Sequence, residues 1–159
     1  MMAIKSNKFL KAFTLMELMV VVVIIGILAA VGSAMFRGPT DKAMMNSTKA
    51  IDKQMTTYIT VEMMNCSMGE TTTMNGNLTC SGRSAASVVA AAVTSQANEQ
   101  KNPFENDKAA VTSGGNNTAE SDAGYIRLSV SGTDIVVKSC HTKPCDTVAM
   151  RQEKKIPFQ

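Results

Sequence analysis

One acid beside a long apolar run is the residue best placed to do chemistry. Glu17 directly precedes the run from Leu18 to Phe36, which carries no charge and a single polar side chain, Ser33. A charge at the centre of a membrane helix costs about 2.5–3.5 kcal/mol, so an acid at such a place usually has a partner or a function. We therefore expect Glu17 to pair with a cation. The alternative is an acid that extends to the lipid headgroups.

Four cysteines offer a second kind of chemistry. Cys66, Cys80, Cys140 and Cys145 all follow the apolar run, and three pairings are possible. We prefer Cys66 with Cys80 and Cys140 with Cys145, because each pairing closes a short loop. His141, the only histidine, lies inside the second loop. Cys140 and Cys145 are too widely spaced for a redox or zinc pair. A turn closed by a disulfide is therefore favoured over a Cys–His nucleophile.

Two groups of residues are candidate metal ligands. Glu105, Asp107 and Asp122 form a weak candidate calcium loop, because their spacing is irregular. Methionines gather between Met44 and Met68, and thioethers can bind copper, but Met more often fills irregular interfaces. The sequence shows no phosphate-binding glycine loop, metal-ligand cluster or serine elbow. We therefore predict no metal, no cofactor and no enzymatic activity.

The apolar run must itself position Glu17, and it is long enough to span a membrane. Nineteen residues at ~1.5 Å each extend ~28 Å, close to the ~30 Å bilayer core. Lys5, Lys8 and Lys11 precede the run, which places the N-terminus in the cytoplasm and the chain after Arg37 outside. Disulfides persist on that outer side. The run exceeds the about 7–15 apolar residues of a secretory signal, so an uncleaved span is favoured.

The charge of the remaining chain excludes one class of function. From Phe13 onward, thirteen Lys and Arg residues balance thirteen Asp and Glu residues. A basic patch with interleaved aromatic residues, as nucleic-acid binding needs, is therefore not indicated. Aromatic residues make up 4% of the chain, so a continuous stacked path for electrons is hard to build.

The N-terminal residues resemble the corresponding segment of type IV pilins and pseudopilins. The resemblance covers residues 8–32 and is carried by the runs KAFTLMELMVVV at 11–22 and IIGILAA at 24–30. Ala12 stands where the family usually has Gly, and Met16 where Ile is commoner. The resemblance implies that a prepilin peptidase in the inner membrane cuts between Ala12 and Phe13, and that Phe13 is then N-methylated. It also implies that Glu17 of an incoming subunit pairs with the Phe13 amine of a neighbour.

The expected energetics indicate that this pair controls which subunits assemble more than it stabilises the finished filament. Removing one partner of a buried pair costs about 3–5 kcal/mol, whereas the intact pair adds little net stability. Burial of the apolar helix supplies the main favourable term, at ~25 cal/mol per Å² removed from water. In lipid that term vanishes. Extraction from the bilayer therefore needs external work, which implies a pilus assembly platform and an ATPase motor.

Four segments are expected along the chain. Residues 1–12 form a basic leader that is removed, 13–38 a transmembrane and filament-core helix, 39–64 an amphipathic half of the same helix, and 65–159 a globular head. The helical propensity is interrupted at Gly26, Gly32, Gly38 and Pro39, because Pro39 removes a donor and disfavours helical dihedrals at Gly38. By resemblance this segment can stretch in a filament. A simple kink at the membrane exit is an equal alternative.

The amphipathic half is predicted from its periodicity. Apolar residues recur with a period near 3.6 between Thr40 and Met64, and charged residues such as Asp52 fall between them. The head should then contain a loop at 65–83 and a helix from Ser84 to Gln100, which Ser84 caps and Asn102-Pro103 stops.

Strands are expected in the rest of the head. A surface loop at 113–117 precedes a hairpin of strands 125–130 and 135–138, with a weaker third strand at 147–156. This order predicts an α+β fold, in which a long N-terminal helix packs on a small antiparallel sheet.

These features together predict a structural subunit of a type IV pilus. It would reside in the bacterial inner membrane before assembly and then polymerise with itself into an extracellular filament, supporting adhesion, motility or DNA uptake. A pseudopilin of a type II secretion or competence system is the first alternative. A bitopic membrane protein with a ligand-binding periplasmic head is the second, and it predicts an uncut leader and indifference to Glu17.

Overall fold

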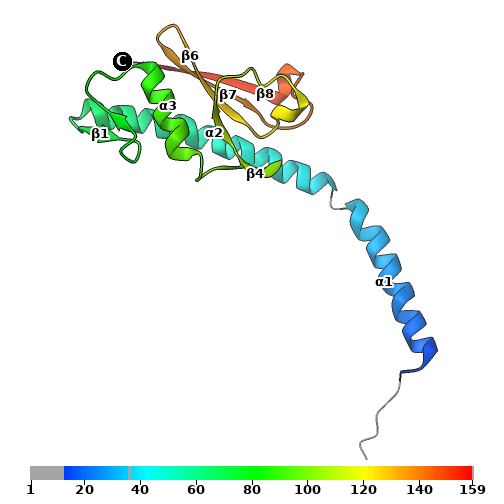
Figure 1. Ribbon diagram of the computed structural model, residues 1–159. Coiled ribbons are helices and arrows are strands. Elements are labelled where there is room, and N and C mark those ends of the chain that lie inside the picture. Colours follow the sequence, from blue (N-terminus) through cyan, green and yellow to red (C-terminus); the bar gives the residue numbers. More distant parts are fainter. Residues whose placement is uncertain (1–12, 36, 159) are drawn as a thin grey trace, which may run out of the picture. The chain divides into compact units, whose positions relative to one another are not determined.

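The computed structural model describes residues 13–35 and 37–158, of which 33–35 and 37 are described by their backbone alone. The chain divides into two compact units, one ending at Pro39 and the other beginning at Thr40. The first unit contains α1 (Leu15–Met35) and the start of α2 (Arg37–Ser67), and the second contains the rest of α2 and the head (Figure 1).

α1 is apolar on all sides. Its segment Leu15–Gly32 has a mean hydropathy of 2.7, none of it is buried, and by length and composition it can cross a membrane. A helix without a polar face needs lipid or other apolar helices around its whole circumference. The composition of α1 therefore favours a helix that is surrounded by lipid or by other apolar helices and not by water.

α2 begins earlier than the sequence indicates. Gly38 and Pro39, expected to interrupt the helix, lie in the first turn of α2. Proline is tolerated in a first turn, because the backbone N–H that it lacks has no helical partner there. The non-helical backbone predicted at Gly38 is therefore wrong, whereas the flexibility of the segment from Gly26 to Pro39 stays a prediction.

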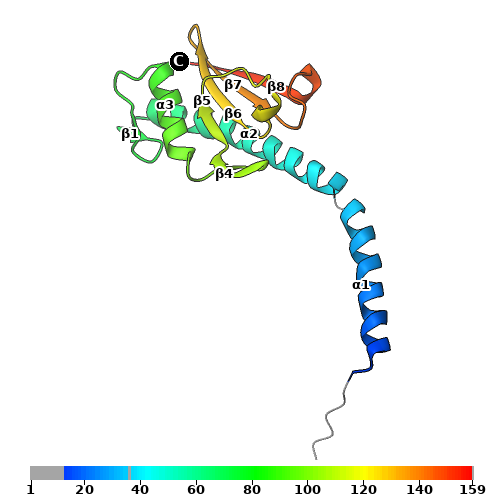
Figure 2. The same cartoon turned by 45° about the vertical axis from the view of Figure 1, so that its right-hand side comes forward.

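The apolar stripe expected on α2 is present. Ile51, Met55, Ile59 and Met63 are buried, at the spacing of one helical face. They share a hydrophobic core with residues of the sheet such as Leu128. Figures 1 and 2 show α2 running along the sheet of the head, with α3 (Ala85–Gln96) beside it.

The main sheet has four strands in the order β5 (Val111–Ser113), β6 (Ile126–Ser131), β7 (Asp134–Cys140) and β8 (Arg151–Pro157). The predicted hairpin is confirmed as β6–β7, where Ser131 pairs with Asp134 across a two-residue turn. β8 pairs antiparallel with β7 and confirms the third strand. β5 was not predicted, and it pairs parallel with β6. The sheet is thus antiparallel-rich instead of purely antiparallel.

Smaller elements complete the head. The segment expected to be only a loop contains the hairpin of β1 (Thr72–Thr73) and β2 (Leu78–Thr79), and further on lie β3 (Lys101–Asn102), β4 (Glu105–Ala109) and the 3₁₀ turns η1 (Glu120–Asp122) and η2 (Val148–Met150). Ser84 caps α3 as predicted, since its side chain accepts a hydrogen bond from Ser87 N. α3 ends at Gln96 instead of Gln100, because Lys101 already pairs with Ala109 in extended backbone.

Candidate functional site

Glu17 lies in the first turn of α1, where Thr14 binds its carboxylate. The Thr14 backbone N and hydroxyl donate to Glu17 Oε2 over 3.4 and 3.3 Å, and Glu17 N donates to Thr14 Oγ1 over 3.2 Å. This reciprocal arrangement is a capping box, and the positive end of the helix dipole also favours the anion. Sequence reasoning missed this role, although the spacing Thr-x-x-Glu carries the signal.

The predicted assembly residues fall together at one end of α1. Phe13 directly precedes Thr14 and is 79% exposed. Ala12 and the leader lie outside the described residues. Gly26 and Gly32 are helical, and a Cβ added at either would meet nothing within 4 Å. A single copy therefore leaves the apolar surface of α1 uncovered, which calls for lipid or further helices.

Replacing Thr14 by Ala should weaken the start of α1. The loss of an N-cap side chain costs about 1 kcal/mol, whereas Thr14→Ser retains a hydroxyl that can accept the same bond. We expect faster hydrogen exchange at the Glu17 amide, which donates to the Thr14 hydroxyl, in the detergent-solubilised Thr14→Ala chain, and near wild-type exchange in Thr14→Ser. Equal protection in all three chains would mean that the capping box contributes nothing.

A second polar cluster lies inside the head. Asp52 on α2 is 1% exposed, and its Oδ2 lies 3.1 Å from Lys154 Nζ and 3.8 Å from His141 Nε2. Burial alone would raise the pKa of Asp52, but hydrogen bonding and charge attraction from His141 and Lys154 lower it. The periodicity of α2 groups Asp52 with its charged positions, yet the structure buries this side chain. The reason is a partner on β8, which local sequence cannot reveal.

This cluster does not have the geometry of a catalytic triad. Ser139 Oγ lies 2.9 Å from His141 Nε2, the same ring nitrogen that faces Asp52. Activation of a serine needs the hydroxyl on one nitrogen and the acid on the other. Ser139 is also fully buried. We therefore read the cluster as a structural link between α2 and the strands β7 and β8.

The remaining sequence candidates also have structural roles. Disulfides join Cys66 to Cys80 and Cys140 to Cys145, with Cα atoms 5.3 and 5.7 Å apart, so no thiol is left beside His141. No three His, Cys, Asp or Glu side chains gather as a metal site within residues 13–35 and 37–158.

Two acids of the candidate calcium loop, Glu105 and Asp122, contact side chains of the protein. Asp122 pairs with Arg127, and Glu105 accepts a hydrogen bond from the Tyr125 hydroxyl over 3.4 Å. Burial raises the pKa of Asp122, but bonds from Ala119 N and Arg127 outweigh it and lower the pKa. Burial and the charge of Glu105 raise the pKa of Tyr125. These two acids are therefore engaged with protein partners.

Comparison with known protein families matches residues 10–33 to the prokaryotic N-terminal methylation motif. The matched segment contains Ala12, Phe13 and Glu17 and most of α1. Comparisons with curated proteins and with solved structures gave no match.

Proposed function

We propose that this chain, which carries the methylation signature of the type IV pilin and pseudopilin family, is a structural subunit of a type IV pilus. The observation that carries the proposal is an exposed helix, apolar on all sides, that begins with the matched motif and one acid. A chain with this helix needs a membrane before assembly and a bundle of like helices afterwards. A polymer held together by α1 supplies that bundle.

Processing would prepare the chain for this polymer. Cleavage between Ala12 and Phe13 removes Lys5, Lys8 and Lys11 and creates a new cationic amine near Glu17. N-methylation of an amine keeps it basic, so the charge persists. The mature chain then keeps its apolar span, unlike a protein released by a secretory signal peptidase.

Mass spectrometry of the mature chain tests this processing. We expect its first residue to be Phe13, carrying the mass of one added methyl group. Ala12→Gly should be processed at least as well, whereas Ala12→Leu should retain the leader, because the junction needs a small residue. A mature chain that begins elsewhere, or that keeps its leader in the wild type, contradicts the proposal.

Glu17 would serve two partners in succession. In a single copy its carboxylate is bound by Thr14 at the start of α1. In the filament it would turn to the Phe13 amine of an adjacent copy, so that two charges costly in an apolar interior neutralise each other. Thr14 would keep the acid ordered at the helix start until that partner arrives.

Burial of α1 away from water would supply most of the stability of the assembled filament. Each large apolar side chain removed from water contributes about 1.5–3 kcal/mol, but helices in lipid gain nothing comparable. Assembly from the inner membrane would therefore depend on a membrane platform and an ATPase motor. The filament would carry the head to the cell surface, where adhesion, motility or DNA uptake can follow.

Electron microscopy of fibres sheared from the producing cells tests the proposed function. We expect long, abundant fibres whose main protein is this chain. A correctly processed chain that stays in the inner membrane, on cells without surface fibres of it, would instead support the pseudopilin alternative.

A further inference from the structure

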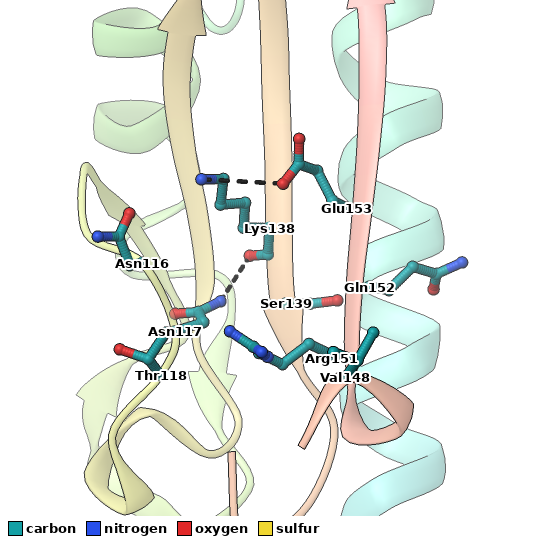
Figure 3. A pocket seen from close by; sticks show the side chains of 9 residues that line it. All are labelled: Asn116, Asn117, Thr118, Lys138, Ser139, Val148, Arg151, Gln152 and Glu153. Atoms are coloured by element: carbon teal, nitrogen blue, oxygen red, sulfur yellow. Dashed lines mark hydrogen bonds and ion pairs between the residues drawn. The ribbon is translucent and has the colours of Figure 1, made fainter. Parts of the chain in front are cut away.

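A polar pocket of about 390 Å³ opens on the head where three segments meet. The loop 116–118 forms one wall, the end of β7 with Lys138 forms the floor, and the first residues of β8, Arg151 and Glu153, form the other wall (Figure 3). The volume lies within the range of about 300–1,000 Å³ that small-molecule sites occupy. Of the polar cluster around Asp52, Ser139 alone belongs to the pocket's lining.

The loop wall is held in one conformation. Asn117 is 1% exposed, and its Nδ2 donates to the carbonyls of Lys138 over 2.9 Å and Tyr125 over 3.3 Å, while its Oδ1 accepts from Arg127 Nε over 2.7 Å. Arg127 also packs so closely on Gly115 that a Cβ there would lie 2.6 Å from its side chain. The pocket is therefore preorganised, which lowers the entropy lost on binding.

The cations of the pocket are only weakly engaged. Arg151 donates to the Asp146 carbonyl over a long 3.4 Å, and within the described part of the chain no carboxylate lies at ion-pair distance from it. Lys138 Nζ lies 3.8 Å from Glu153 Oε2, and both side chains are partly exposed. A solvated pair at this distance is weak. The lining thus holds two cations, Lys138 and Arg151, and one carboxylate, Glu153, which leaves a net charge of +1.

The other lining groups suit hydroxyls. Asn116 and Thr118 place an amide and a hydroxyl along the loop wall (Figure 3), and Glu153 adds an acceptor at the opposite edge. An amide donates and accepts, whereas a carboxylate only accepts, so the set fits a ligand with several hydroxyl groups. The carboxylate of Glu153 disfavours ligands with more than one negative charge.

We propose that this pocket binds an acidic sugar, a hexose ring that bears a single carboxylate. The planar guanidinium of Arg151 can hold that carboxylate with two parallel hydrogen bonds, and Lys138 adds a second positive charge. Asn116, Thr118 and Glu153 take the ring hydroxyls. The lining contains no aromatic ring on which a sugar could stack, so we expect a dissociation constant of order 1 mM for one site. Binding by a single copy does not depend on the proposed filament.

Ligand-observed NMR on the full mature chain in detergent micelles tests the proposal. The probes are glucuronate, glucose as its neutral counterpart, acetate as the carboxylate alone, and inorganic phosphate. We expect glucuronate to bind at least about tenfold more tightly than the other three, since each lacks either the charge or the hydroxyls or carries a second charge. Phosphate or acetate that binds as well as glucuronate would reduce the pocket to a simple anion site and overturn the proposal.

Two variants place the binding in the pocket. Arg151→Gln should weaken glucuronate at least about tenfold, whereas Lys101→Gln, which removes an exposed charge on β3, should leave it unchanged. Asn116→Ala, at an exposed loop position, should weaken glucuronate and leave the weak binding of acetate as it is. Circular dichroism confirms that each variant is folded. Arg151→Gln with wild-type glucuronate binding would overturn the proposal.

Discussion

Glu17→Gln and Glu17→Val chains should be cleaved normally and yet fail to form ordered filaments. Neither substitution changes the junction at Ala12 and Phe13, so the leader should be removed as in the wild type. Each leaves the Phe13 amine of the neighbouring copy without its counter-charge. Because an unpaired buried charge costs about 3–5 kcal/mol, incorporation of a subunit should fall by roughly two to four orders of magnitude.

The two substitutions also separate the two roles of Glu17. Gln can still accept the hydrogen bonds of Thr14 that close the capping box, whereas Val cannot. If pairing with the neighbouring amine is decisive, both variants fail alike. If capping is decisive, only Val fails.

Mass spectrometry and electron microscopy of sheared fibres measure the two outcomes. Asp41→Asn is the matched control, because it removes an exposed acid of α2 and should leave the fibres unchanged. Normal fibres from both Glu17 variants would refute the pairing role.

Replacing Lys154 by Met should destabilise the head by about 3 kcal/mol. The variant keeps the volume at this position on β8 but leaves the carboxylate of Asp52 buried without its nearest cation. Uncompensated buried charge is the costly case, whereas an intact buried pair adds little by itself. The double variant Asp52→Asn, Lys154→Met should therefore recover more than half of the loss, since it removes the charge as well.

Urea unfolding followed by circular dichroism measures these free energies of unfolding. Lys155→Met is the matched control, because Lys155 is the exposed neighbour on the same strand and has no comparable partner in the described residues. A Lys154→Met head as stable as the Lys155→Met head would show that the buried pair is not needed.

The same variants make a prediction about acid. The pKa of Asp52 is lower in the folded head than in the unfolded chain. The pair therefore contributes its full stabilisation above the unfolded value of about 4 and loses it as the pH falls through the folded-state pKa. The wild-type head should lose stability in acid more steeply than the double variant. Parallel curves for the two chains would contradict this assignment.

Features that depend on neighbours in the chain were predicted well. The acid at 17 and the start of the apolar run lie within the segment that matches the methylation motif, and their close spacing made that motif visible in the sequence. The stripe of α2, the cap of α3 and the β6–β7 hairpin likewise depend on spacings of a few residues.

Features that depend on contacts between distant segments were missed. β5 pairs in parallel with β6, which requires the chain between them to cross back before β6 begins. No local pattern in the sequence encodes that crossover. Asn117 lies in a stretch typical of a surface loop, yet it is buried against β6 and β7. The pocket exists only because this loop, β7 and β8 meet.

Asp52 shows most clearly where local inference ends. Its position on α2 reads as one more charged residue between apolar ones, and its chemistry is that of an ordinary exposed aspartate until the head folds. Water is then excluded, and Lys154 arrives from β8 and His141 from the residue after β7, both far along the chain. The chain order of the N-terminal motif was thus enough to indicate the methylation motif and a helix that can cross a membrane, because those signals lie close together in the sequence. The burial of charges in the head depended on packing, because desolvation is a property of everything that surrounds a group and not of its neighbours in sequence.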